Sequence, residues 1–143
     1  TATFSTCFGA AFMTLHPTRY ADLLQQKLDQ HGSHAYLVNS GWSGGAFGTG
    51  SRMSIATTRA CIDAILNGSI HDAEFTEDPI FGLQTPVSLP GIEDATVLNP
   101  RATWEDESAY EAQATKLARM FQDNFSQYRG KGSVDYEQYG PQL

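Results

Sequence analysis

Residues 35–68 read AYLVNSGWSGGAFGTGSRMSIATTRACIDAILNG, and three different patterns follow one another in this segment. Residues 35–39 form a short apolar run with the length of a buried strand. Glycines are then too dense between residues 41 and 50 for a regular helix or strand, so we expect a loop. From Ala56 the pattern is helical, mostly apolar and therefore expected to be buried, and Asn67 with Gly68 offers a C-terminal cap. The segment thus predicts a strand, a glycine-rich loop and a helix.

Outside this segment, the sequence predicts two further helices and an irregular region. Residues 19–30 place leucines on one face, and Gly32 offers a stop for that helix. Apolar side chains at steps of three and four over residues 110–128 predict a helix of about 20 residues. Four prolines between residues 69 and 100 predict short β-strands and turns. The polar tail after Gly130 is expected to be loose.

The composition is that of an ordinary folded domain, because 41% of the 143 residues are hydrophobic and 17% are charged. The net charge of −7 disfavours nucleic acid and anionic membrane surfaces as partners, so we expect neither. No apolar run has the roughly 20 residues that a membrane-spanning helix needs. The chain starts at Thr1 without the features of a signal peptide, and we expect a piece of a longer protein.

Residue types that often carry chemistry give only weak signals here. Cys7 and Cys61 fit neither a disulfide framework nor a zinc site, and they favour a reducing compartment. Trp42 and Trp104 fit core or interface positions better than ligand platforms. The histidines show no spacing typical of metal ligands, and no Ser, His and Asp triad can be assigned from sequence order. They are His16, His31, His34 and His71.

A strand, a glycine-rich loop and a helix in this order can cradle a phosphate, because backbone amides and a helix N-terminus both present N–H donors. Here Ser51 follows Gly50 directly, where a phosphate loop has a lysine. The loop therefore fits a turn better than a nucleotide contact, and both interpretations stay open. Arg52 has the group that stacks on a base and pairs with phosphate, although an isolated arginine is more often solvated. Thr58 lies where a hydroxyl usually bonds to its own helix backbone.

Several segments taken together resemble one family. They are FSTCFGAAF at residues 4–12, LHP at 15–17, YLVNSGWSGG at 36–45, GSRMSIATTRACIDAILNGS at 50–69 and LNPR at 98–101. In this order, they are similar to the C-terminal end of ATP-dependent phosphoenolpyruvate carboxykinases, over nearly the whole chain.

The resemblance implies an α/β fold, with residues 1–143 as one incomplete domain of the catalytic lobe. This is part of the mixed-sheet C-terminal nucleotide-binding lobe, with three main helices and short strands. It also implies a cytoplasmic, metal-dependent lyase of gluconeogenesis that converts oxaloacetate and ATP to phosphoenolpyruvate, CO2 and ADP. ATP would bind with Mg2+, and a second metal, commonly Mn2+, would bind through ligands outside this chain.

For the site, the resemblance implies that Arg52 lies against the base of ATP, Met53 lines the adenosine pocket and Thr58 offers a hydroxyl. It implies no catalytic residue and no metal ligand in these 143 residues, because the family's equivalents lie upstream. The rest of the same polypeptide would then supply the oxaloacetate site, and the chain alone would be inactive. Cys7 follows the region of the family's mobile lid, and we expect a buried structural thiol. The loop at residues 44–51 is longer than in some members, which leaves its conformation open.

Two alternatives belong to other classes of protein. The chain could be a stand-alone module that binds an adenine nucleotide without catalysis. It could also be a structural domain in which the glycine-rich loop is a turn and the following helix only packs.

Overall fold

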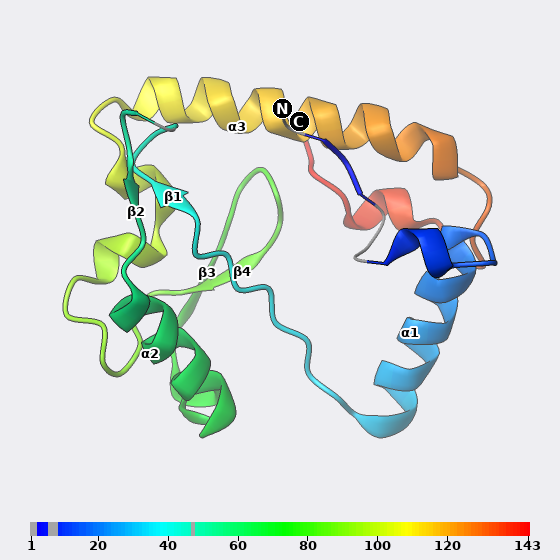
Figure 1. The fold of residues 1–143 in the computed structure, drawn as a ribbon, viewed down its shortest axis with the longest axis horizontal. Helices are drawn as coiled ribbons and strands as arrows, with labels where there is room; N and C mark the ends of the chain where they lie inside the picture. Colours follow the sequence, from blue (N-terminus) through cyan, green and yellow to red (C-terminus); the bar gives the residue numbers. More distant parts are fainter. Residues whose placement is uncertain (1–2, 6–8, 47) are drawn as a thin grey trace. The chain divides into compact units, whose positions relative to one another are not determined.

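The computed structural model describes residues 3–5, 9–46 and 48–143. The chain divides into two compact units, and we describe each by itself. The first unit is Thr1–Tyr36 with Arg119–Pro141, and the second is Leu37–Ala118 with Gln142–Leu143. Figure 1 shows the order of the elements along the chain. Within the described residues, three α-helices and four short strands confirm the expected α/β class.

The first unit begins with helix α1, Pro17–His31, which confirms the predicted helix and starts two residues before it. Pro17 is at the first helical position, where a missing N–H costs nothing. The helix ends at Gly32, whose left-handed conformation with φ of 58° lets its N–H bond to the carbonyl of Leu28. Cys7, for which we expected a buried thiol, lies outside the described residues.

The C-terminal segment of residues 131–139 packs on α1, as the ribbon in Figure 1 shows. Thr18 is only 5% exposed, and its hydroxyl donates to the carbonyl of Lys131 over 2.7 Å. Asp22 accepts hydrogen bonds from Ser133 and Tyr136. The prediction of a loose tail after Gly130 is therefore wrong. Polar side chains of the tail meet polar side chains of α1, and hydrophobic periodicity does not report such contacts.

The second unit holds two antiparallel pairs of short strands. Strands β1, Trp42–Ser43, and β2, Ser51–Arg52, pair with Trp42 opposite Arg52. Strands β3, Phe75–Glu77, and β4, Gln84–Pro86, confirm short β structure between residues 69 and 100. The strand predicted at residues 35–39 is wrong for this chain. This run has no partner strand among the described residues, and a strand needs a neighbour to form its hydrogen-bond ladder.

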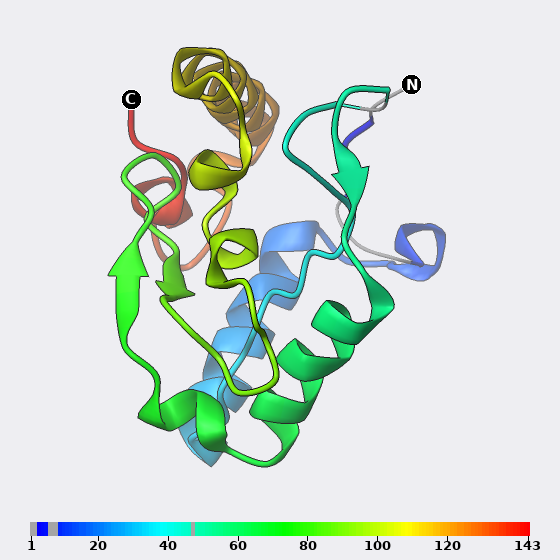
Figure 2. The ribbon, with the colours of Figure 1, turned by 90° about the vertical axis from the view of Figure 1, so that its left-hand side faces the viewer.

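Helix α2, Ile55–Leu66, follows β2 almost directly, as Figure 2 shows. Its buried residue Ala64 packs with Ile70 and Leu89 in a small core that Cys61 also contacts. Burial raises the pKa of the Cys61 thiol above its ordinary value, which disfavours the reactive thiolate. The expectation of a buried helix is confirmed only for the side of α2 that carries Ala64, because Ile55 at the start of the helix remains 72% exposed.

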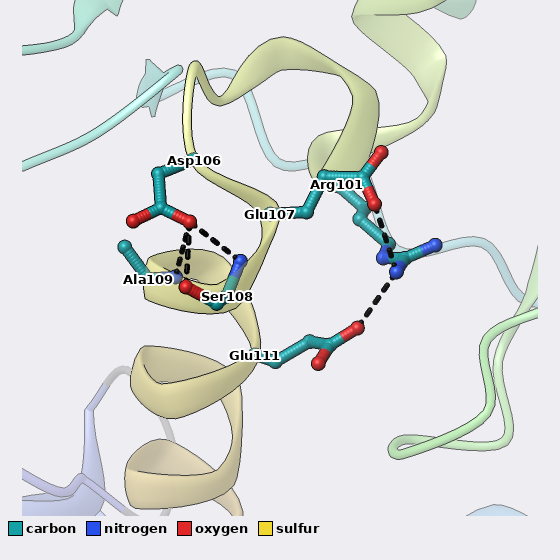
Figure 3. A network of polar contacts seen from close by, with 6 residues as sticks. All are labelled: Arg101, Asp106, Glu107, Ser108, Ala109 and Glu111. Carbon is teal, nitrogen blue, oxygen red and sulfur yellow. Dashed lines mark hydrogen bonds and ion pairs between the residues drawn. The ribbon is translucent and has the colours of Figure 1, made fainter.

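Helix α3, Glu107–Phe125, confirms the predicted long helix, although Tyr128 lies in a 3-10 turn after its end. Figure 3 shows the start of α3, where Asp106 accepts hydrogen bonds from the backbone N–H groups of Ser108 and Ala109. These bonds satisfy donors that a helix start otherwise leaves without a partner. In the described part of the chain, no helix is both long and apolar enough to cross a membrane.

Candidate nucleotide-binding site

The glycine-rich loop forms a hairpin that joins β1 to β2. The N–H of Met53 donates to the carbonyl of Gly41 over 3.0 Å and extends the contact between the two chain segments beyond Arg52. At the tip, the N–H groups of Thr49 and Gly50 donate to the carbonyl of Ala46 over 3.0 and 2.9 Å. The expectation of a loop without regular structure between residues 41 and 50 is therefore wrong at Trp42–Ser43, which form β1. Strand β2 begins directly after this range. The loop leads into a strand, so these residues do not form the strand, loop and helix arrangement of a phosphate cradle.

The packing around Gly50 shows why glycine is needed at one position of the glycine-rich loop. A Cβ atom at this position would lie 2.5 Å from the carbonyl oxygens of Ser43 and Gly45. Real Cβ atoms do not come so close to backbone atoms, so only glycine lets the two sides of the hairpin approach in this way. Gly44 adds a left-handed conformation with φ of 76°.

Thr103 anchors the hairpin from a distant part of the sequence. Its Oγ1 accepts hydrogen bonds from the N–H of Gly44 over 3.0 Å and from the hydroxyl of Ser43 over 3.2 Å. The same hydroxyl donates to the carbonyl of Pro100 over 2.7 Å. The turn at Pro100–Thr103 therefore lies beside β1. Sequence reasoning missed Thr103, because a single threonine about 60 residues from its partners gives no periodic signal.

The three predicted site residues lie on one continuous segment, from β2 to the first turn of α2. Arg52 is exposed in β2, Met53 is half-buried, and Thr58 is half-buried in α2. The hydroxyl of Thr58 donates to the carbonyl of Ser54 over 3.0 Å, as expected for a hydroxyl near a helix start. Ser54 caps the helix by accepting the N–H of Thr57 over 3.0 Å. These bonds hold the start of α2, and the pairing of β2 with β1 holds Arg52.

Arg52 differs from two other arginines of the chain. Arg101 forms ion pairs with Glu107 over 2.9 Å and with Glu111 over 2.7 Å, as Figure 3 shows. Arg129 pairs with Glu137. Within the described residues, no carboxylate forms an ion pair with Arg52. Its positive charge is therefore not neutralised by a carboxylate within the described residues.

A cavity of about 750 Å³ lies elsewhere in the second unit, between β3, β4 and the start of α3. Tyr110, Arg101 and Asp78 are among its lining residues, and none of the three predicted site residues lines it. Burial, with a smaller contribution from the charge of Asp78, raises the pKa of Tyr110 above its ordinary value. The neutral form of the Tyr110 phenol is thus favoured. Because the cavity is not lined by Arg52, Met53 or Thr58, it does not support the predicted nucleotide contacts.

The chain resembles known proteins over nearly all of its length. Residues 1–95 match the family model described as phosphoenolpyruvate carboxykinase. The chain belongs to the phosphoenolpyruvate carboxykinase family. A relative from Paracoccus denitrificans, named phosphoenolpyruvate carboxykinase (ATP), is 57% identical over 131 residues, which are 92% of this chain and 24% of the relative. A relative of the same name from Sulfurimonas denitrificans is 52% identical over 143 residues, or 99% of this chain and 27% of the relative.

This phosphoenolpyruvate carboxykinase chain therefore spans about a quarter of the length of the curated relatives that it matches. The matched residues 1–95 include the hairpin of β1 and β2 and the whole of α2. In the part that the structure describes, no three His, Cys, Asp or Glu side chains are grouped so that they could hold a metal ion.

Proposed function

We propose that the chain is the C-terminal segment of an ATP-dependent phosphoenolpyruvate carboxykinase. The whole enzyme would decarboxylate oxaloacetate and transfer a phosphoryl group from ATP, giving phosphoenolpyruvate, CO2 and ADP in cytoplasmic gluconeogenesis. The observation that carries this proposal is the 50–57% identity to relatives of that name over 88–99% of the chain. Residues 1–143 would be an incomplete part of the catalytic lobe, and the rest of the polypeptide would complete it.

In this proposal, the segment from β2 to α2 binds the adenosine part of ATP. The guanidinium of Arg52 would lie against the base, because its flat cationic group stacks on aromatic rings. Met53 would supply an apolar and adaptable wall. The hydroxyl hydrogen of Thr58 is already donated to Ser54, so its oxygen would act as an acceptor, for example of an amino or hydroxyl group of the nucleoside.

The phosphoryl-transfer chemistry would be performed by residues outside this chain. Phosphoryl transfer needs cations and metal ions around the moving group, and Mg2+ and Mn2+ would be held by ligands upstream. Oxaloacetate would bind in that part as well. The chain alone would therefore be inactive, and its role would be to position the nucleoside for residues that it does not itself contain.

Calorimetric titration of ATP with Mg2+ tests the proposal in the complete polypeptide that carries this chain. Arg52→Ala removes the stacking group, and we expect it to weaken ATP binding about tenfold or more. Arg119→Ala, at an exposed arginine of α3, is the matched control and should bind ATP as the unchanged protein does. Unchanged affinity in Arg52→Ala would refute the proposed site.

The same titration separates the proposal from a stand-alone nucleotide-binding module. We expect the 143-residue chain by itself to bind ATP weakly, and the complete polypeptide to bind tightly and to form ADP only when oxaloacetate is present. Equal binding by the chain alone, without oxaloacetate-dependent ADP formation by the complete polypeptide, would favour the stand-alone module instead.

A further inference from the structure

The hydroxyl of Thr103 uses its full capacity for hydrogen bonds, which is one donor and two acceptor positions. Its hydrogen is donated to the carbonyl of Pro100 over 2.7 Å. Its oxygen accepts the N–H of Gly44 over 3.0 Å and the hydroxyl of Ser43 over 3.2 Å. The first bond closes the Pro100–Thr103 turn, and the other two hold the end of β1. One side chain thus joins this turn to the hairpin.

The backbone of the hairpin also approaches the turn closely. A Cβ atom at Gly44 would lie 2.9 Å from the carbonyl oxygen of Thr103, so a residue with a side chain would push the two segments apart. Ser43 lies directly opposite Ser51 in the strand pair, and Ser51 is next to Arg52. The contact with Thr103 is therefore made one residue pair away from Arg52.

The turn is itself attached to the start of α3 on both sides of Thr103. Before it, Arg101 forms ion pairs with two glutamates of α3, as Figure 3 shows. After it, the ring of Trp104 packs edge-on against Tyr110 of α3, with ring centroids 5.8 Å apart. Exposed ion pairs alone contribute little, but here an aromatic contact acts together with them. Helix α3 thus fixes the turn, and the turn holds the hairpin.

We propose that Thr103 is a positioning residue for nucleotide binding, which fixes the hairpin to α3 and thereby holds Arg52 where it meets the nucleotide. This inference rests on the proposed function, and it adds a residue outside the segment that the family resemblance implies. In this role, Thr103 acts through Arg52 and does not contact the nucleotide. Strands β1 and β2 have two residues each, and such a short pair needs an anchor outside the hairpin to keep one position.

Titration of ATP with Mg2+ into the complete polypeptide tests this inference. Thr103→Val keeps the shape of the side chain but leaves the N–H of Gly44 without its acceptor, and we expect about five- to tenfold weaker ATP binding. Thr103→Ser keeps the hydroxyl and should restore most of the affinity. Thr96→Val is the matched control, because the hydroxyl of Thr96 donates to Asp94 only two residues away. Unchanged ATP affinity in Thr103→Val would overturn the inference.

Inorganic triphosphate with Mg2+ separates positioning from a general loss of structure. This ligand has no adenosine part, so Thr103→Val should bind it as the unchanged protein does. An equal loss of ATP and triphosphate binding would show a merely structural role for Thr103 and overturn the inference. Amide hydrogen exchange gives a second readout, because the N–H of Gly44 should exchange faster in Thr103→Val than in Thr103→Ser. Equal exchange in the two variants would also overturn the inference.

A double-mutant cycle shows whether Thr103 acts through Arg52. In the Arg52→Ala background, Thr103→Val should weaken ATP binding little further, because the group that it positions is already missing. A full additional loss would overturn the inference.

The single variants separate this inference from the proposed function. If Arg52→Ala leaves ATP binding unchanged, the proposed function of the segment fails, and the role of Thr103 fails with it. If Arg52→Ala weakens ATP binding and Thr103→Val does not, only the role of Thr103 is refuted.

Discussion

The phenol of Tyr136 donates a hydrogen bond to Oδ1 of Asp22 over 2.8 Å, although 114 residues separate the two in sequence. The same oxygen accepts hydrogen bonds from the hydroxyl of Ser133 over 2.7 Å and from its N–H over 3.2 Å. Hydrogen bonds from the Ser133 hydroxyl and then from Tyr136 lower the pKa of Asp22 below its ordinary value of 3.8. One carboxylate of α1 therefore holds the C-terminal segment of residues 131–139.

Asp22→Ala should release this segment from α1, because it removes the common acceptor of three hydrogen bonds. We expect faster amide hydrogen exchange and faster proteolysis within residues 131–139. Asp29→Ala is the matched control, since Asp29 is an exposed aspartate of the same helix whose carboxylate accepts a hydrogen bond from Gln25 within α1. Unchanged protection of the segment in Asp22→Ala would contradict the assignment.

The docking of this segment should also depend on pH. Because the pKa of Asp22 is lowered in the folded state, its contribution to stability is present above the unfolded pKa and is lost as pH falls through the folded value. The nearby charge of Arg19 acts in the same direction. The amide resonance of Ser133, followed by NMR, should therefore move to its undocked position as the pH falls below 3.8, the ordinary pKa of an aspartate. In Asp22→Ala, the Ser133 resonance should stay at its undocked position at every pH. If the resonance of this variant still moved with pH, a group other than Asp22 would cause the transition.

Gly50→Ala should disrupt the hairpin of β1 and β2. The new methyl group would meet backbone atoms of Ser43 and Gly45, which cannot move aside as a flexible side chain can. We expect the complete polypeptide to bind ATP about tenfold or more weakly, since β2 carries Arg52. Gly41→Ala is the control, because its nearest atom is the side-chain oxygen of Asn39 at 3.4 Å. Equal ATP affinity of the two variants would show that the hairpin does not position Arg52.

Leu89→Ala should weaken the small core beneath α2. Leu89 is 6% exposed and packs with Ala64 and Ile70, so its truncation leaves a cavity and should cost about 2–5 kcal/mol. Amide exchange of α2 in the complete polypeptide measures this loss as a lower free energy of local opening. Leu83→Ala, at a residue that is 50% exposed, should change the same quantity by less than about 0.5 kcal/mol. An unchanged free energy of opening in Leu89→Ala would contradict the assignment of this core.

The 143-residue chain expressed alone should be marginally stable or self-associating. Among the described residues, no large side chain is fully buried, while Leu37, Leu66 and Ile55 remain 86%, 79% and 72% exposed. Apolar surface of this kind tends to bind other apolar surface. Analytical ultracentrifugation over a range of concentrations checks the association. A monomeric mass together with a sharp unfolding transition that does not depend on concentration would contradict the prediction.

The sequence correctly predicted those helices whose residue pattern lies within one short stretch of the chain. The helices α1 and α3 have periodic apolar residues, and α2 has a mostly apolar helical pattern that ends at Asn67 and Gly68. Each was therefore found close to its observed bounds. The strand at residues 35–39 was not found, because an apolar run shows that a segment can be buried and does not supply a partner strand. The contacts of Thr103 and Asp22 join residues that are far apart in sequence, and no local pattern reports them. The predicted roles of Arg52, Met53 and Thr58 stay predictions.

The hairpin that carries Arg52 is held at its base by strand pairing and has free space around Gly48 near its tip. Strand pairing and the bond from Met53 to Gly41 hold the base, whereas a Cβ atom at Gly48 would have no atom within 4 Å. Insertions and deletions near Gly48 can thus be absorbed without a change in the register of β2. The tip is accordingly a suitable place to insert a cysteine for a fluorescent dye that reports on nucleotide binding while Arg52 keeps its position.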